Sequence, residues 1–350
     1  MMKYLSTGNE ACGEGAVRAG CRFYAGYPIT PQNELTAYMS RRMEEEGGTF
    51  IQAESELAAV SMVFGASLVG AWAMTSSSSP GISLKQEGIS YLVGAELPAV
   101  IVNVMRGGPG LGNIAPAQGD YFQSTKGGGH GDYHIIVTAP ASVQEMFDFT
   151  YDAFCLADKY RVPVMILADG MLGQMMEPLE FDENIKPCPV IPKPWALTGA
   201  KGREAQSIKS LLLGTGKTSL EEHNKKLQKK YKEIEDKEVS VEMYKVDDAE
   251  KIVVAYGSTS RITRACVERL RKTGEKVGLV RPMALWPFPY KEIRKLAEKG
   301  LKFLVVEMSA GQMVEDVRLA VQDDRMVSFY GRMGGGVPTE AAILEKIKEL

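Results

Sequence analysis

The stretch Gly26-Tyr27-Pro28-Ile29-Thr30-Pro31 decides how this chain is interpreted. It separates an apolar run at 22–25, which predicts a buried strand, from a segment at 32–39 that predicts a helix. Proline restricts its own backbone and that of the preceding residue, so the junction is a stiff strand-to-helix turn. Pro31 suits the first helical turn, and the Thr30 hydroxyl would lie near free backbone N–H groups. In a parallel sheet such a turn lies where ligands bind; a purely structural turn is the alternative.

Composition limits the class of protein. The 350 residues, 45% hydrophobic and 24% charged with a net charge of −3, predict a globular protein of two domains without a nucleic-acid surface. Met1–Tyr4 is not followed by the apolar core of a signal peptide, and no apolar run is long enough to span a bilayer. We therefore expect a cytoplasmic protein that binds neither nucleic acid nor membrane.

The cysteines are too scattered to suggest a metal or disulfide site. The chain has 5 of them, at 12, 21, 155, 188 and 266, and none forms a Cys-x-x-Cys pair. A disulfide framework, a zinc knuckle and an iron–sulfur cluster held by this chain alone are therefore not expected. The thiols are interpreted as small buried hydrophobes in a reducing compartment.

Helix and strand patterns alternate between about 9 and 175. Strands are expected at 49–53, 71–75, 98–105, 135–137 and 162–167, and helices at 56–70, 84–94 and 142–159. The almost wholly apolar 98–105 is typical of a strand buried on both faces. This alternation predicts an α/β fold with a parallel sheet. The long Gly-rich loop from Arg106 to Asp132 is either functional or disordered, and its start at the end of a central strand favours function.

The alternating pattern stops near 176 and resumes near 250. Prolines indicate an extended connector at 181–249, in which a capping box at Ser219–Glu222 opens a charged helix with Leu220, Leu227, Tyr231 and Ile234 on one stripe. Its lysines form a solvated face or, alternatively, dock an acidic partner. The second α/β unit, at 250–350, has strands at 251–256, 276–280 and 301–306. Gly257–Thr259 lacks the spacing of known phosphate loops.

Glu56 is the strongest candidate for acid–base chemistry. It opens an otherwise apolar helix directly after the strand at 49–53, so its carboxylate is expected to be largely desolvated. Such a group can hold or donate a proton against a ligand nitrogen. Alternatively, Glu54 and Glu56 are ordinary acids of a first helical turn. His130, in the Gly-rich loop, is a weaker candidate and is expected to pack the loop.

Arg106 ends the buried strand 98–105. A guanidinium at that place needs an anionic partner, either a protein carboxylate or a substrate carboxylate. Thr30, Glu56 and Arg106 all follow parallel strands, so they are expected to line one edge of one sheet.

These motifs together resemble the alpha subunit of 2-oxoacid:ferredoxin oxidoreductases. The resemblance rests on Tyr27–Pro31, Glu56, Arg106 and Gly128–Tyr133, and in the second unit on Gly311–Val317, and it covers nearly the whole chain. Arg281–Pro282 and Trp286–Pro289 fit the family as well. Two further segments, Pro109–Ile114 and Gly173–Pro178, look most like the 2-oxoisovalerate branch of the family.

The resemblance implies a fold and roles for single residues. It implies a thiamine-diphosphate pyrimidine-binding domain at 1–180 and a transketolase-C-terminal-like domain at 250–350. The residue matching Glu56 contacts N1′ of the aminopyrimidine ring and favours the tautomer that activates the cofactor. Tyr27, Pro28 and Ile29 belong to the same cofactor site, while Thr30 and Arg106 bind the carboxylate of the 2-oxo acid.

The family also implies partners. Ala168-Asp169-Gly170 is the nearest approach to the Gly-Asp-Gly motif that holds diphosphate and Mg²⁺ in thiamine enzymes, and no Asn follows at the expected distance. The chain therefore resembles one half of a site that a beta subunit completes, with the Mg²⁺ site in that subunit and iron–sulfur clusters in gamma- or delta-type subunits. Coenzyme A is the expected co-substrate and ferredoxin the electron acceptor. This chain itself is expected to bind no metal, and to be active only with its partners.

The expected substrate is a branched-chain 2-oxo acid. Between Gly107 and Thr125 there is no Lys or Arg for a second substrate carboxylate, and Lys126 is the first cation. Leu111 and Ile114 instead suit an apolar side chain. Two alternatives remain open: the same class of enzyme acting on 2-oxoglutarate or pyruvate, and a non-catalytic assembly or regulatory subunit.

Overall fold

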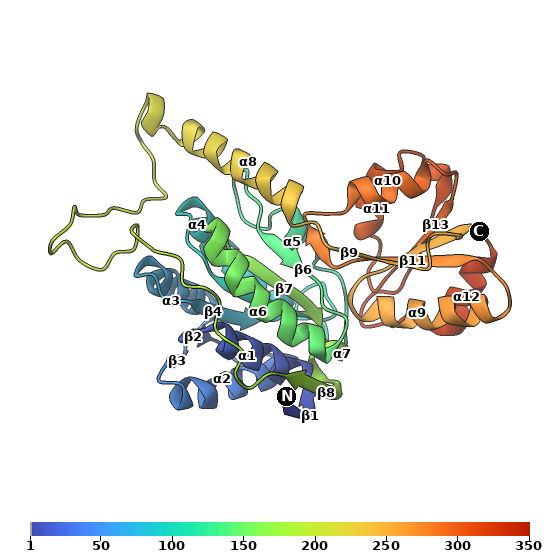
Figure 1. The fold of residues 1–350 in the computed structure, drawn as a ribbon, viewed down its shortest axis with the longest axis horizontal. Helices are drawn as coiled ribbons and strands as arrows, with labels where there is room; N and C mark the ends of the chain where they lie inside the picture. The colour runs from blue at the N-terminus through green and yellow to red at the C-terminus, as the bar shows by residue number, and fades with distance from the viewer. Residues whose placement is uncertain (1) are drawn as a thin grey trace.

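The computed structural model describes residues 2–350 as two mainly parallel sheets with helices packed on them, together with a two-stranded antiparallel sheet of β1 (Met2–Thr7) and β8 (Met176–Phe181) (Figure 1). Of the two mainly parallel sheets, the larger belongs to the first half of the chain and the smaller to the last third. The α/β class expected from the sequence is thereby confirmed. In this described part of the chain no helix has the length and apolar character needed to cross a membrane.

The larger sheet has seven strands in the order β12-β6-β7-β5-β4-β2-β3. Its strands are β2 (Phe23–Gly26), β3 (Thr49–Gln52), β4 (Ala73–Ser77), β5 (Val100–Met105), β6 (Ile136–Thr138), β7 (Val164–Asp169) and β12 (Ala284–Trp286). All pairings are parallel except that of β12 with β6. The order reverses between β2 and β4, because β3 lies on one side of β2 and the later strands lie on the other. Ligands bind at such reversals in open α/β sheets.

Helices connect these strands. They are α1 (Gly8–Ala19), α2 (Asn33–Glu45), α3 (Glu56–Leu68), α4 (Ser79–Gly94), α5 (Tyr121–Thr125), α6 (Val143–Tyr160) and α7 (Gly170–Gln174). Of these, α2, α3, α4 and α6 lie where the sequence predicts helices, whereas α5 and α7 were not expected. Helix α1 packs against α6 and α2, and α3 packs against α4.

Three local expectations were wrong. Pro31 precedes α2, which begins only at Asn33 after the N-cap Gln32, so it does not occupy the first helical turn. The helix expected at 84–94 begins earlier, at Ser79, because Pro80 fits a first turn that lacks N–H partners. The pattern does not dissolve at 176 either, since β8 (Met176–Phe181) pairs antiparallel with β1 (Met2–Thr7).

The smaller sheet has five strands in the order β14-β13-β10-β11-β9. The strands are β9 (Val241–Tyr244), β10 (Lys251–Val254), β11 (Val277–Pro282), β13 (Lys302–Glu307) and β14 (Val327–Gly331). Its helices are α9 (Gly257–Lys272), α10 (Tyr290–Ala297), α11 (Met313–Val321) and α12 (Glu340–Lys348), and the short 3₁₀ turns lie at Gly216–Thr218 and Asp324–Met326.

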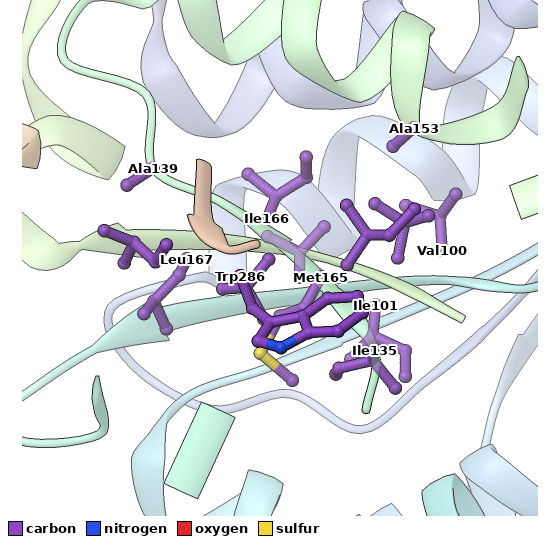
Figure 2. Packing of buried hydrophobic residues seen from close by; sticks show 14 of the residues in the cluster. Val100, Ile101, Ile135, Ala139, Ala153, Met165, Ile166, Leu167 and Trp286 are labelled. Carbon is purple, nitrogen blue, oxygen red and sulfur yellow. The ribbon is translucent and has the colours of Figure 1, made fainter. Parts of the chain in front are cut away.

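Strand β12 joins the two halves of the molecule. It comes from the last third of the chain but extends the larger sheet through β6. Its Trp286 is buried in the same hydrophobic cluster as Ile101 and Met165 (Figure 2). The Trp286 ring also stacks on His134, with the ring centroids 4.7 Å apart. Burying one aromatic side chain of this size contributes about 2–3 kcal/mol, which helps to hold the halves together.

The connector ends in helix α8 (Leu220–Lys237), which lies along the first half of the molecule, while the segment before it projects away (Figure 1). The Ser219 side chain caps α8 as the capping motif predicts. Leu227, Tyr231 and Ile234 are buried as expected, but Leu220 is 50% exposed. Lys226 and Lys230 both donate to the Glu96 carboxylate, so part of the charged face binds the chain's own first half.

The expectation that all cysteines are free thiols was wrong. Cys155 on α6 and Cys188 in the connector form a disulfide with a Cα–Cα distance of 5.5 Å. The two residues are 33 positions apart, and they meet because the connector runs back along α6, where the Tyr151 hydroxyl donates to the Lys186 carbonyl. Cys12, Cys21 and Cys266 are buried free thiols, as expected.

Candidate active site

Hydrogen bonds of the buried Gln32 side chain fix the turn at 27–31 that follows β2. The Gln32 side chain is fully buried and its Nε2 donates to the Tyr27 carbonyl at 3.3 Å. Its Oε1 accepts from Ser76 at 2.6 Å and from Thr36 at 3.0 Å. A buried amide satisfied in this way fixes the backbone it contacts. Above it, Tyr27 and Thr30 are exposed.

Arg106 contacts this turn directly. Its guanidinium is only 6% exposed, and its Nη1 donates to the Thr30 carbonyl at 3.0 Å. Its Nη2 donates to the Leu111 carbonyl at 3.0 Å, while Nε is buried without a partner. Both acceptors are neutral oxygens, so an anionic ligand would complement the positive charge.

The Gly-rich loop folds back over Arg106. Gly112 has φ +61°, and a Cβ at this position would lie 1.7 Å from the Gly107 carbonyl oxygen. Only glycine permits this return, which brings the Leu111 carbonyl to the guanidinium. The disordered alternative for this loop is therefore wrong.

The farther part of the loop contacts the smaller sheet. The Gln118 side chain accepts from the Met308 N–H at 2.9 Å and from Thr259 at 2.8 Å, and it donates to the Tyr256 carbonyl. Lys126 forms an ion pair with the buried Asp316 at 2.5 Å. The loop thus reaches from the edge of the larger sheet to the second half of the chain.

Ser79, at the start of α4, holds the main chain of Arg106. Its Oγ accepts from the Arg106 N–H at 3.1 Å and donates to Asp120 at 2.6 Å. Asn103 donates to the same carboxylate at 2.9 Å. Burial raises the pKa of Asp120, and these two hydrogen bonds partly oppose that effect.

Glu56 opens α3, as the sequence predicts. Its helix is capped by Ser55, whose side chain accepts from the Ala58 N–H at 3.2 Å, and the glutamate is only 6% exposed. Gly81 of α4 leaves room for its carboxylate, because a Cβ on Gly81 would lie 2.5 Å from Glu56 Oε1 and 2.0 Å from Ser77 Oγ. The first turn of α4 therefore borders both Glu56 and Arg106.

Lys85, on the next turn of α4, was missed by the sequence analysis. It is fully buried, and its Nζ donates to the Glu56 carbonyl at 3.3 Å and to Thr75 at 3.0 Å. Burial lowers the pKa of Lys85 to about 7, and the negative charge of Glu56 partly opposes this shift. The sequence feature that could have indicated a buried Lys85 is its position within the helical segment Gly81–Gly94, which carries many apolar residues.

Three buried polar atoms without a hydrogen-bond partner in the described part of the chain lie at this edge of the sheet. Ser77 Oγ, Ser78 Oγ and Arg106 Nε are buried and lack a hydrogen-bond partner within residues 2–350. Leaving one such group unsatisfied costs about 1–3 kcal/mol. These atoms and the Glu56 carboxylate have the chemistry to bind a polar heterocycle together with a small anion.

The remaining candidates lie at the periphery. His130 Nδ1 lies 3.4 Å from Ser90 Oγ, and the His130 ring packs edge-on against the Tyr91 ring. Both contacts agree with a loop-packing role. Leu111 and Ile114 are 82% and 64% exposed. Among the residues that the structure describes, no group of three or more His, Cys, Asp or Glu side chains is placed to hold a metal ion.

A parallel sheet with a reversal point, a buried glutamate at one helix start and a buried arginine at the end of a strand agree with the class of thiamine-diphosphate-binding domains. The family model described as pyruvate flavodoxin/ferredoxin oxidoreductase, thiamine diphosphate-binding, matches residues 14–244. A second model, described as pyruvate:ferredoxin oxidoreductase core domain II, matches residues 249–343. The chain belongs to the 2-oxoacid:ferredoxin oxidoreductase family, and the resemblance drawn from its motifs is confirmed.

Two relatives show which subunits of this family the chain is similar to. It is 53% identical to the ketoisovalerate oxidoreductase subunit VorB of Methanothermobacter thermautotrophicus, over 100% of this chain and 98% of the relative. It is 38% identical to the 2-oxoglutarate synthase subunit KorA of Methanothermobacter marburgensis, over 99% of this chain and 98% of the relative.

Solved structures agree on the fold. A 2-oxoglutarate:ferredoxin oxidoreductase from Magnetococcus marinus, solved with 2-oxoglutarate, coenzyme A and succinyl-CoA bound, superposes with a TM-score of 0.88 at 28% identity. The match covers 99% of this chain, which spans 65% of that longer chain. A split-gene transketolase superposes with a TM-score of 0.60 at 13% identity over 98% of this chain and 97% of its own, which supports the fold alone.

Proposed function

We propose that this chain is the alpha subunit of a thiamine-diphosphate-dependent 2-oxoacid:ferredoxin oxidoreductase that decarboxylates a branched-chain 2-oxo acid such as 2-oxoisovalerate. The products are the acyl-CoA and carbon dioxide, and the electrons pass to ferredoxin. The observation that carries the proposal is the buried Arg106 guanidinium, bonded to Thr30 at the carboxyl edge of the sheet and left with a free Nε.

Arg106 and Thr30 would bind the substrate carboxylate. A guanidinium is planar and can donate two parallel bonds to a carboxylate. Its bonds to the Thr30 and Leu111 carbonyls orient it before substrate arrives, so less freedom is lost on binding.

Glu56 would hold a proton against the aminopyrimidine nitrogen of the cofactor, and Tyr27, Pro28 and Ile29 would border the ring. The burial of Glu56 and the unpartnered hydroxyls of Ser77 and Ser78 support this assignment. When bound, thiamine diphosphate supplies the electron sink for decarboxylation. A largely buried carboxylate is suited to this task because water does not compete for its proton.

The rest of the machinery would come from partners. Asp169, in the nearest approach to a diphosphate motif, already caps α7 through the Met171 and Leu172 N–H groups. We therefore assign the diphosphate and Mg²⁺ site to a beta subunit and the iron–sulfur clusters to gamma- or delta-type subunits, with coenzyme A as co-substrate. The domain division at 1–180, 181–249 and 250–350 and a cytoplasmic location belong to the same proposal.

The composition of the Gly-rich loop between Gly107 and Thr125 supports a branched substrate. Lys126, the cation nearest to Arg106 in the loop, is paired with Asp316, which also accepts from Tyr121 at 2.6 Å. It is therefore not free to bind a second substrate carboxylate, while Leu111 and Ile114 present apolar surface. The 53% identity to a ketoisovalerate oxidoreductase subunit points to the same substrate class.

The test is purification of the native complex and measurement of ferredoxin or viologen reduction with coenzyme A. The substrates are 2-oxoisovalerate, 2-oxoglutarate, pyruvate and 2-oxobutyrate. We expect the highest kcat/KM with 2-oxoisovalerate. A highest value with 2-oxoglutarate keeps the enzyme class but overturns the substrate; no reduction by a complex loaded with cofactor and clusters overturns the function.

A further inference from the structure

We propose that Lys85 is a positioning residue for Glu56, a buried ammonium that anchors the first turn of α3 and supplies a positive charge near the Glu56 carboxylate. This inference rests on the proposed function, because it concerns the same glutamate.

The position of Lys85 is unusual for a lysine. Its side chain is fully buried, whereas lysine almost always keeps its ammonium in water. The two acceptors of its Nζ, the Glu56 carbonyl and Thr75 Oγ1, are both neutral. Burying an ammonium with only neutral acceptors costs free energy, so a structural role alone would be served better by an apolar residue.

The contacts of Lys85 reach the candidate active site directly. The Glu56 carbonyl belongs to the first residue of α3, so a bond to it fixes the turn from which the Glu56 side chain projects. Thr75 lies on β4 and is fully buried, which gives the lysine a rigid second anchor. Lys85 thus ties α3 to the strand beside it.

Charge links the two residues as well. Glu56 is the ionisable group whose charge acts on Lys85, and its negative charge favours the protonated lysine. A protonated Lys85 therefore places a positive charge beside the first turn of α3, from which the Glu56 side chain projects.

The test compares Lys85→Met, Glu56→Gln and the double variant in the reconstituted complex. Methionine has a similar length but lacks the charge and the donors. Lys193→Met is the matched control, since Lys193 is also largely buried, at 13% side-chain exposure, but pairs with Asp158. Three quantities are measured: thiamine diphosphate affinity of the cofactor-free complex by calorimetry, kcat as a function of pH, and the melting temperature.

We expect Lys85→Met to lower kcat about ten-fold and to change the pH dependence of kcat near pH 7, where Lys85 itself titrates, with no loss in melting temperature. In the Glu56→Gln background, Lys85→Met is expected to change cofactor affinity by less than about two-fold, because the lysine acts through the missing carboxylate. Lys193→Met is expected to lower the melting temperature and to leave the pH profile in place.

The inference is overturned if Lys85→Met leaves kcat and the pH profile as in wild type, or if it weakens cofactor binding equally in both backgrounds. It is also overturned if the loss of activity is matched by an equal loss of folded protein. Failure of the proposed function is distinguishable, because then Glu56→Gln itself leaves turnover unchanged.

Discussion

Arg106, at the end of β5, donates from Nη1 to the Thr30 carbonyl across 3.0 Å, which joins residues 76 positions apart. The bond spans β4, because β5 and β2 both flank that strand in the sheet. It therefore ties together two turns that belong to the same carboxyl edge of the sheet.

Arg106→Lys is expected to raise KM for the 2-oxo acid about ten- to hundred-fold with a smaller change in kcat. Lysine keeps the charge but cannot reach both carbonyls and a carboxylate at once. Steady-state kinetics of the complex measure this, with Arg41→Lys as the control, since the Arg41 side chain is 64% exposed. An unchanged KM would remove Arg106 from the substrate site.

Glu56→Gln is expected to reduce turnover by at least about a hundred-fold while the complex still assembles, because glutamine cannot exchange a proton with the cofactor. Glu54→Gln is the matched control, since Glu54 is exposed and lies two residues earlier. Equal activity of the two variants would contradict the catalytic role and favour a non-catalytic subunit.

Glu96→Gln is expected to loosen α8 from the first half of the chain. Burial tends to raise the pKa of Glu96, but hydrogen bonds from Lys226 and Lys230 outweigh it and lower the pKa to about 2. A lowered carboxyl pKa stabilises the fold above its unfolded value of about 4.3, and the contribution disappears as the pH falls toward 2.

The variant should therefore lose about 1–3 kcal/mol of stability at pH 7, and should match wild type near pH 2. Thermal unfolding and limited proteolysis of α8 across this pH range measure the difference. Glu87→Gln is the control, because in the described structure the Glu87 side chain accepts only from the exposed Tyr91 hydroxyl. A loss that does not depend on pH would contradict the ionic explanation.

Lys85→Met is expected to change how stability depends on pH. Burial lowers the pKa of Lys85 to about 7, so between pH 7 and about 10 the unfolded chain binds more protons than the folded one. Lys85 therefore makes the protein more stable as pH rises through this window, and destabilises it below pH 7. The melting temperature of the variant should exceed that of wild type most near pH 6, and this excess should shrink toward pH 10.

Cys155→Ser is expected to lower the melting temperature of the oxidised chain. A disulfide that closes a loop of this length stabilises a fold by about 3–4 kcal/mol in the chain-entropy estimate. Alkylation of the unfolded, unreduced chain should label three of its 5 cysteines, namely Cys12, Cys21 and Cys266. Wild type with reductant should melt like the variant; labelling of every cysteine would show that the bond does not form.

Local patterns in the sequence were enough to find the main parts of the candidate site. The apolar run before Gly26, the prolines after it and the helical pattern from Asn33 are neighbours in the chain, so their geometry follows from short-range preferences. The same holds for Glu56 at the start of α3 and Arg106 at the end of β5. Parallel strands then place all three at one edge, because each connection returns the chain to the same end of the sheet.

Other features depend on contacts between distant residues, which no local pattern encodes. The proximity of Gly81 to Glu56, the bond from Lys85 to the Glu56 carbonyl and the disulfide between Cys155 and Cys188 arise only when helices pack. The insertion of β12 into the larger sheet is of the same kind. The sequence by itself therefore determined the candidates Thr30, Glu56 and Arg106, whereas tertiary packing decided what surrounds them, because burial and charge coupling are properties of neighbours in space.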